Sequence, residues 1–407
     1  MKKIIKTALF VAGAAMIAAC SNKDKTTPAA GLTLSGLNPA DFDTTYVDAT
    51  RGEKKVALYT LTNQNGMEVC ITNMGGRIVS VMVPDKDGNM QDVVLSYPTA
   101  KDFFPKVNGS DFGASIGRYA NRINKGQFPL GDSIIQLATN NYGHMLHGYD
   151  APWQYVPYDA EQPDSQTVIL KLESPDGEGH FPGKVNVTVT MKLTEDNAID
   201  ITYNGTTDAP TILNMTNHSY FNLSGDPTKP ITDHVMYINA DTYTPTDSTY
   251  MTTGEIAKVE GTAFDFRTPK VIGQDFAGET VDPALIGDGE MKDGAYTHSG
   301  YDHNWCLNTY KDGKGDETTV ACTAYCPSTG IQLDVYTSEP GVQFYSGNFQ
   351  DGTVVGKKGL VYPKNAAFCL ETQKYPDAPN KPTWPSCSLN PGEEYYHRCV
   401  YKFSIHK

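Results

Sequence analysis

A strict alternation of apolar and polar residues constrains this chain more than any other feature of its sequence. The segment from Val185 to Thr194 reads V-N-V-T-V-T-M-K-L-T, with an apolar residue at every second position. Successive side chains of an extended strand point to opposite faces, so this segment predicts a strand with one face in a core and the other toward solvent. An amphipathic helix would instead repeat its apolar residues every three or four positions.

Further runs of this kind, separated by turn residues, extend the prediction over most of the chain. Asn65-Gly66 joins the run 56–62 to the run 67–73, and Asp87-Gly88 closes a second pair; both dipeptides favour tight hairpin turns. The other expected strands cover 167–172, 198–203, 235–240, 318–325, 331–337 and 396–405. Neither a long amphipathic helix past the N-terminal segment nor a fixed repeat is visible. The sequence therefore predicts an all-β fold with one large antiparallel β-sandwich.

The first forty residues are typical of an export segment. Three lysines, at positions 2, 3 and 6, precede an apolar run from 8 to 19 that is short for a membrane span. The run ends I-A-A-C at Cys20, which resembles the lipobox of bacterial lipoproteins, where the chain is cut before an acylated cysteine. We expect residues 1–19 to be a lipoprotein signal peptide, 20–40 to be the lipidated Cys20 and a flexible tether, and 41–407 to be one folded domain.

That N-terminal segment implies a location and a membrane contact. The protein is expected in the bacterial cell envelope, lipid-anchored at the outer membrane, with the lipid as its single contact with the bilayer. Its 33 basic and 47 acidic residues give a net charge of −14. A chain of this sign has no general attraction to a phosphate backbone, which argues against nucleic acid as a partner.

The cysteines do not predict a disulfide framework. If Cys20 is lipidated, seven of the eight cysteines remain, so at least one is unpaired in a monomer. Cys322 and Cys326 would lie about 13 Å apart in an extended strand, beyond disulfide reach. The cysteines at positions 70, 306 and 369 lie among strand-forming residues and are expected to be small buried side chains.

Five short segments combine Gly, Asn or Tyr with charged or imidazole side chains, which is typical of loops and strand ends that face a polar ligand. They are GRYANRI at 117–123, HMLHGY at 144–149, NHSYFNL at 217–223, YDHNW at 301–305 and CLETQ at 369–373. Taken singly, each also fits a surface ion pair or a buried histidine. His144 and His147 would chelate a metal only on a helix, whereas the preceding N-N-Y-G favours a turn. Glu371 stands out, because the apolar run 366–370 would place its carboxylate in a partly buried position.

In chain order, these segments and their neighbours resemble the galactose mutarotase (aldose 1-epimerase) family. The blocks that carry the resemblance, over roughly residues 52–404, are ITNMGGRIVS from 71, FGASIGRYANRI from 112, LHGYD from 146, SPDGEGHFPG from 174, TNHSYFNLSG from 216, GTAFDFRTPK from 261, YDHNW from 301, EPGVQFYSGNFQDG from 339 and CLETQKYPDAPN from 369. The resemblance implies a β-supersandwich that interconverts the α and β anomers of free hexoses, such as galactose and glucose. It also implies that no cofactor or metal is needed and that the protein is a monomer or a weak dimer.

The resemblance further implies roles for single residues. Glu371 matches the family's general base and His218 its general acid. The positions that match hexose-binding residues are Arg122, His147 and Asp302, with Asn121 and Gln343 as further sugar contacts. These types suit the reaction, because opening a pyranose removes a proton from the C1 hydroxyl and adds one to the ring oxygen. Tyr149 and His180 depart from the residues frequent in the family, which puts the preferred sugar in question.

Three other functions remain open at this point. A hexose 6-phosphate epimerase would need a cationic pocket, for which Arg118 and Arg267 are available. A glycoside hydrolase would use Asp302 and Glu371 as its two carboxylates and would leave the segment around His218 without a role. A non-catalytic envelope sugar-binding protein would use the same cleft without needing an acid and a base.

Overall fold

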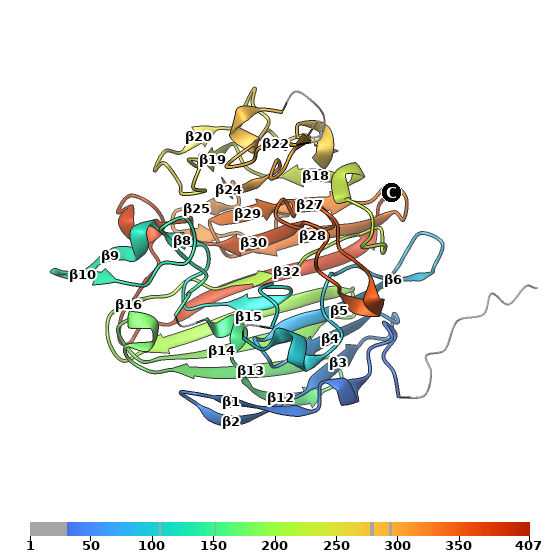
Figure 1. The fold of residues 1–407 in the computed structure, drawn as a ribbon, viewed down its shortest axis with the longest axis horizontal. Coiled ribbons are helices and arrows are strands. Elements are labelled where there is room, and N and C mark those ends of the chain that lie inside the picture. Colours follow the sequence, from blue (N-terminus) through green and yellow to red (C-terminus); the bar gives the residue numbers. More distant parts are fainter. Residues whose placement is uncertain (1–30, 106, 151, 277–280, 293–294) are drawn as a thin grey trace, which may run out of the picture.

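The computed structural model describes residues 31–105, 107–150, 152–276, 281–292 and 295–407. The expected signal peptide and Cys20 lie outside these residues. Within them, regular structure consists of β-strands and short 3-10 helices (Figure 1). No helix of the described ranges has the length and apolar character needed to cross a lipid bilayer.

A nine-stranded antiparallel sheet forms the largest layer. Its strands, in spatial order, are β12 (Asp159–Asp164), β13 (Thr167–Ser174), β14 (Val185–Leu193), β15 (Ala198–Thr207), β32 (Tyr395–Ile405), β28 (Ile331–Thr337), β27 (Cys322–Tyr325), β18 (Val235–Ile238) and β21 (Lys270–Val271). The alternating segment of the sequence is β14, in which every second residue from Val185 is buried. The predicted half-buried strand is therefore confirmed. The last strand in the chain, β32, lies in the middle of this sheet, between β15 and β28.

Two smaller antiparallel sheets complete the sandwich. One has the order β20 (Ala257–Lys258), β19 (Thr242–Thr244), β24 (Asp302–Cys306), β29 (Gly341–Tyr345) and β30 (Cys369–Gln373), and the other has the order β3 (Leu58–Thr62), β4 (Glu68–Thr72), β5 (Arg77–Pro84) and β6 (Met90–Asp92). The second sheet contains both hairpins that the Asn-Gly and Asp-Gly dipeptides predicted. The all-β antiparallel sandwich is confirmed.

The remaining elements are short. The two-stranded pairs are β1 (Thr44–Asp48) with β2 (Gly52–Val56), β7 (Ala114–Ile116) with β17 (Thr216–His218), β8 (Arg122–Ile123) with β11 (Met145–Leu146), β9 (Gln127–Leu130) with β10 (Ser133–Gln136), β16 (Thr211–Ile212) with β31 (Ser388–Leu389), β22 (Met291–Lys292) with β23 (Ala295–Tyr296), and β25 (Tyr310–Lys311) with β26 (Lys314–Gly315). The 3-10 helices are Pro39–Asp41, Ala100–Phe103, Asn124–Gly126, Trp153–Tyr155, Glu178–His180, Ile231–Asp233, Ile272–Gln274, Pro283–Leu285, Lys357–Gly359 and Ala378–Asn380.

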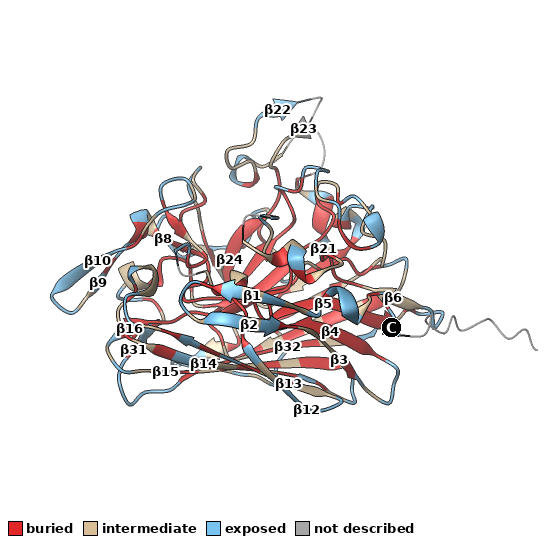
Figure 2. Cartoon of the chain, turned by 60° about the horizontal axis from the view of Figure 1, so that its bottom comes forward, coloured by how far each residue is buried: buried red, intermediate tan, exposed pale blue. Residues whose placement is uncertain are grey.

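One hydrophobic core joins the three large sheets. It includes Val69 of β4, Val187 of β14 and Phe344 of β29, together with the fully buried Trp305 of β24. Figure 2 shows the buried segments gathered in the centre of the fold, while the β9–β10 hairpin is largely exposed. Because strand residues alternate between faces, packing Trp305 and Phe344 into the core turns Asp302 and Gln343 to the opposite face of the same sheet.

Two expected boundaries were wrong. The strand predicted at 318–325 starts only at Cys322, because the carboxylate of Asp316 accepts hydrogen bonds from Thr318 and Thr319 and holds them in a turn. The expectation of a flexible tether up to residue 40 was wrong for its described part. Leu34 donates its backbone N–H to Glu68 at 2.7 Å, and Leu37 is buried. The polar composition of this segment suggested a solvated linker, but the hydroxyl of Ser35 bonds to that of Ser80 on β5 at 3.1 Å, which helps the segment to pack on the sheet.

The expectations for the cysteines are confirmed within the described residues. The seven cysteines there are all buried, and none forms a disulfide. Burial raises the pKa of most of these thiols, that of Cys70 to about 12, so they behave as small apolar side chains.

Candidate active site

The strand register of the five-stranded sheet brings polar side chains together on its outer face. Asn304 of β24 pairs with Gln343 of β29, and Gln343 pairs with Glu371 of β30. These three strands lie side by side in Figure 1. The carboxylate of Glu371 is only 3% exposed, in agreement with the apolar run that precedes it.

His218 reaches this face from a different strand pair. It ends β17, which pairs with β7 so that His218 lies opposite Ala114. Its Nε2 is 3.6 Å from Oε1 of Glu371. Its ring stacks on Tyr220, with the centroids 5.1 Å apart and an interplanar angle of 18°. The expected acid and base therefore face each other at nearly hydrogen-bonding distance, with the imidazole held in place by an aromatic ring.

Asn121 and His147 are locked together beside them. The backbone N–H of Asn121 donates to Nδ1 of His147 at 3.1 Å, and the N–H of His147 donates to the carbonyl of Asn121 at 3.2 Å. Both residues have positive φ, 64° and 54°, a conformation that costs energy in a non-glycine residue and is found at functional sites. Since Nδ1 accepts, the neutral ring of His147 carries its hydrogen on Nε2. The ring is edge-on to His218, with centroids 5.2 Å apart.

A third group links Arg122, Asp302 and Gln343. Nε2 of Gln343 donates to Oδ1 of Asp302 at 2.7 Å, and Nη2 of Arg122 lies 3.8 Å from Oδ2 of the same carboxylate. Nε of Arg122 donates to the side chain of Asn141 at 3.0 Å. Planar guanidinium and amide donors held in this way suit a ligand with several hydroxyl groups.

A cavity of about 280 Å³ lies among these groups. Its lining includes six of the seven expected residues, Asn121, Arg122, His147, His218, Asp302 and Glu371, while Gln343 lies behind Asp302. Sequence reasoning missed the other lining residues, Asp111, Asn141, Tyr142, Leu146, Tyr220, Tyr345 and Phe349. Two of these could have been found, because Tyr220 and Tyr345 follow His218 and Gln343 at the i+2 spacing that keeps strand residues on one face.

Burial and local charge set the protonation of the site. Burial, helped by Asp302 and Asp111 and opposed by Arg122, raises the pKa of Glu371 well above its usual range. Burial lowers the pKa of His218, with Asp111 acting in the opposite direction. Burial, with His218 and Arg122, lowers the pKa of His147 well below its usual range. His147 is therefore a neutral donor, and the two opposite shifts favour the neutral forms of Glu371 and His218.

The potential metal-ligating groups overlap with this acid–base pair. Asp111, His147 and His218 form one group, and His218, Cys369 and Glu371 form another, each with ligand atoms within 4.8 Å of one another. A metal ion bound there would use the atoms that proton transfer needs. The residues before His144 form the predicted turn, closed by the bridge between Asn141 and His144, and the two histidines flank strand β11 and not a helix. His144 is engaged elsewhere, through the N–H of Lys125 and the hydroxyl of Thr249.

The two arginines considered for a phosphate site point elsewhere. Arg118 is buried and donates to the carbonyls of Pro182 and Gly183, both at 2.9 Å. Arg267 pairs with Asp265 and lines a different cavity. Among the described residues, the guanidinium of Arg122 is the single permanently cationic group that lines the candidate site.

The two departures from the family pattern do not line the site. Tyr149 is 44% exposed and lies outside the set of lining residues, and His180 is exposed as well. Neither side chain lines the cavity, so neither can alter the preferred sugar by direct contact.

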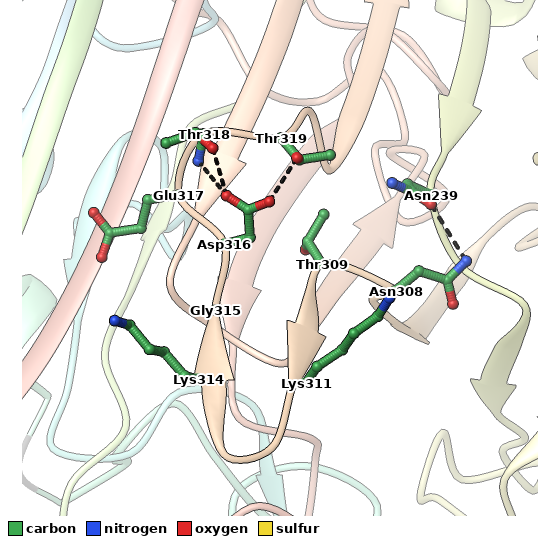
Figure 3. Close-up of a pocket in the computed structure, with 10 residues that line it drawn as sticks. All are labelled: Asn239, Asn308, Thr309, Lys311, Lys314, Gly315, Asp316, Glu317, Thr318 and Thr319. Carbon is green, nitrogen blue, oxygen red and sulfur yellow. Dashed lines mark hydrogen bonds between the residues drawn. The ribbon is translucent and has the colours of Figure 1, made fainter.

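A larger cavity of about 800 Å³ beside β25 and β26 is chemically different (Figure 3). Two lysines, Lys311 and Lys314, and two acidic residues lie on its wall. The carboxylate of Asp316 is already occupied by Thr318 and Thr319. Its lining contains no imidazole and no aromatic ring, so the smaller cavity remains the candidate active site.

Three comparisons with known proteins bear on this site. The family model described as aldose 1-epimerase matches residues 57–402. Galactose mutarotase of Homo sapiens is 40% identical over 340 residues, which cover 83% of this chain and 92% of the human protein. Aldose 1-epimerase of Escherichia coli K12 is 35% identical over 348 residues, covering 85% of this chain and 94% of the bacterial one.

Solved structures resemble the fold over similar lengths. The structure of a GalM/aldose epimerase homologue from C. elegans has a TM-score of 0.76 and 27% identity, covering 86% of this chain and all of its own. The galactose 1-epimerase from Lactobacillus acidophilus has a TM-score of 0.73 and 26% identity, covering 89% of this chain and 98% of its own.

Proposed function

The chain belongs to the aldose 1-epimerase family, and we propose that it interconverts the α and β anomers of free hexoses, such as galactose and glucose, in the cavity around Glu371 and His218. The observation that carries this proposal is the buried pair itself. A carboxylate and an imidazole nitrogen face each other at 3.6 Å, inside a ring of groups suited to sugar hydroxyls. Sugar binding alone does not need such a pair.

The reaction requires two linked proton transfers. Glu371 takes the proton of the C1 hydroxyl, while the protonated imidazole of His218 gives a proton to the ring oxygen. The bond between C1 and the ring oxygen breaks as the C1 carbonyl forms. The open aldehyde then rotates about the C1–C2 bond, the ring oxygen attacks the other face of C1, and both protons return along the same routes. No atoms are gained or lost, and the enzyme ends in its starting state.

The other residues hold the sugar while these protons move. Asp302 accepts hydroxyl hydrogens, and Arg122 and His147 donate to hydroxyl oxygens. Asn121 fixes the tautomer of His147 through its backbone N–H, and Gln343 orients the carboxylate of Asp302. Because these side chains are already held in place, they lose little conformational entropy when the sugar binds.

Arg122→Lys is expected to raise KM for galactose by about tenfold and to lower kcat less, because lysine keeps the charge but cannot bond to Asn141 and face Asp302 at once. Polarimetry at several sugar concentrations measures both constants. Arg267→Lys is the matched control, since Arg267 lies outside the cavity. An unchanged KM in Arg122→Lys would remove Arg122 from the binding site.

The pH dependence of kcat/KM is expected to be bell-shaped, with its plateau across neutral pH. The pair of Glu371 and His218 is active when it holds one proton in total. Activity falls on the acidic limb because the pair gains a second proton, and on the alkaline limb because it loses its only proton. Burial lowers the pKa of His218, which weakens binding of the second proton. Burial and the neighbouring carboxylates raise the pKa of Glu371, which strengthens binding of the last. The alkaline midpoint should therefore lie well above the usual range of a free glutamate.

That profile is measured by polarimetry across pH, with the spontaneous rate subtracted at each point, because protons and hydroxide also catalyse mutarotation. A profile that stays flat from mildly acidic to alkaline pH would contradict the pairing of Glu371 with His218.

The decisive test of the proposed function is polarimetry of freshly dissolved α-D-galactose and α-D-glucose, with and without protein, in a non-catalytic buffer. We expect a strong acceleration over the spontaneous rate, and the ratio between the two sugars gives the preference. If folded protein binds sugar and accelerates neither reaction, the protein is a sugar-binding protein instead. If it acts on 6-phosphorylated hexoses alone, it is a hexose 6-phosphate epimerase.

The N-terminal sequence supports a second part of the proposal. The lipobox-like segment ending at Cys20 favours a lipid-anchored enzyme at the outer membrane, acting on sugars that reach the envelope, and we propose that this enzyme is a monomer or weak dimer. Metabolic labelling with a fatty acid tests this directly, because label should enter the wild-type protein and be absent from Cys20→Ala. Light scattering of the purified protein gives its oligomeric state.

A further inference from the structure

A third carboxylate in the cavity, that of Asp111, has no part in the proposed reaction so far. Asp111 lines the same cavity as Glu371 and His218. Its Oδ1 is buried and has no hydrogen-bond partner in the protein. One of its oxygens, one ring nitrogen of His147 and one of His218 lie within 4.8 Å of one another. An unpaired buried oxygen costs free energy, so a role for it is expected.

The backbone holds this carboxylate firmly toward His218. Asp111 precedes β7, and its carbonyl accepts the N–H of Ala114 at 3.0 Å. Ala114 lies opposite His218 in the β7–β17 pair, and the N–H of Gly113 donates to the carbonyl of His218 at 2.9 Å. The turn that carries Asp111 is therefore bonded to the backbone of the histidine it faces.

A fully buried arginine secures the same turn. Nη1 of Arg77 donates to the carbonyls on either side of Asp111, those of Ser110 at 3.3 Å and Phe112 at 2.9 Å, while Nη2 donates to Gln154. The guanidinium of Arg77 thus donates these hydrogen bonds to backbone carbonyl oxygens. The Asp111 carboxylate is thus fixed in place without being paired to the cation that fixes its backbone.

Several charged or titratable groups surround the imidazole of His218. Those from neighbouring elements are Glu371 and Cys369 on β30, Asp302 on β24, Arg122 on β8, His147 after β11, Arg77 on β5, Tyr345 on β29 and Asp111 before β7, and Tyr220 follows His218 in the sequence. Asp302 is already engaged by Gln343 and Arg122, and Glu371 must accept a proton in the reaction. Asp111 takes no proton in the proposed steps, and its Oδ1 has no hydrogen-bond partner, while the carboxylate also contacts the hydroxyl of Tyr155.

We propose that Asp111 is a positioning residue for the epimerase reaction, whose fixed negative charge stabilises the protonated form of His218 and so keeps the acid of the acid–base pair loaded. The inference rests on the proposed function. The direction of the electrostatic effect agrees with it, because burial lowers the pKa of His218 and Asp111 is the charge that most opposes this. Asp111 acts through the histidine and not on the sugar.

The test compares Asp111→Asn, which removes the charge and keeps the shape, with Asp132→Asn, which removes an exposed carboxylate from the β9–β10 turn. In Asp111→Asn we expect both limbs of the pH profile of kcat/KM to move about one unit lower, as loss of one charge near a partly buried pair predicts, so that kcat/KM on the alkaline limb falls by up to about tenfold. Asp111→Glu should recover part of the activity and of the shift. Asp132→Asn should leave the profile unchanged.

A measurement without turnover separates this inference from the proposed function. The ring nitrogens of His218, observed by NMR in histidine-labelled protein and assigned with His218→Asn, should show less protonation in Asp111→Asn than in wild type at the same pH. An unchanged His218 titration, or a higher KM with an unmoved pH profile, would overturn the inference and make Asp111 a sugar contact. An inactive wild-type enzyme would instead refute the proposed function, and the NMR titration would still decide the role of Asp111.

Discussion

Glu371→Gln is expected to lower kcat for mutarotation by about a thousandfold, within the range by which general bases usually contribute. The amide has nearly the same shape as the carboxylate and fills the same buried position on β30, but it cannot take the C1 proton. Asp302 cannot replace it, since Asp302 is bonded to Gln343 and faces Arg122. The fold should be unaffected, because no buried volume is lost.

The rate is best measured at anomeric equilibrium by NMR exchange spectroscopy, which detects interconversion without a change in optical rotation. Glu161→Gln on the exposed edge strand β12 is the matched control for the same chemical change. Near-wild-type turnover in Glu371→Gln would end the assignment of Glu371 as the base. A melting temperature far below that of wild type would show a structural effect, and the rate would then be compared in Glu371→Asp.

His218→Asn is expected to lower kcat by about a hundredfold or more, because no other group is placed to protonate the ring oxygen. Asparagine retains a hydrogen-bonding side chain in the buried position beside Tyr220 but cannot carry a transferable proton. The double variant with Glu371→Gln should be little slower than Glu371→Gln alone, since the two residues act as one unit.

His180→Asn is a suitable control for this variant. His180 is exposed and has a positive φ of 68°, a conformation that asparagine adopts readily. The His180→Asn variant should keep full activity and the wild-type ratio of the rates with galactose and with glucose. Fully additive losses in the double variant would show that Glu371 and His218 act independently, which would contradict a concerted acid–base pair.

The sequence predicted the fold well where a local pattern carried the information. β14 alternates because one face of the nine-stranded sheet is buried, and the Asn65-Gly66 turn sets the β3–β4 hairpin. Boundaries failed where side chains competed with strand hydrogen bonds. Asp316 holds two threonines out of β27, and the backbone N–H of Leu34 is taken by Glu68, which draws the expected tether onto the fold.

The site was predictable in its chemistry but not in its assembly. Glu371 and His218 were assigned from short segments that resemble a family, and the structure brings them to 3.6 Å. Asp111 was missed because nothing near it in the sequence marks it as facing a histidine more than one hundred positions away. That contact depends on the register of β7 with β17, and long-range register is a property of the whole sandwich.

The central place of β32 has a consequence for how the enzyme is made. This last strand lies between β15 and β28, so the nine-stranded sheet is split into two parts until residues 395–405 have been synthesised. Pairing strands so distant in the chain closes large loops, which makes folding slow and late. A polypeptide still emerging from the ribosome therefore cannot complete its sandwich until its last strand is free to insert between β15 and β28.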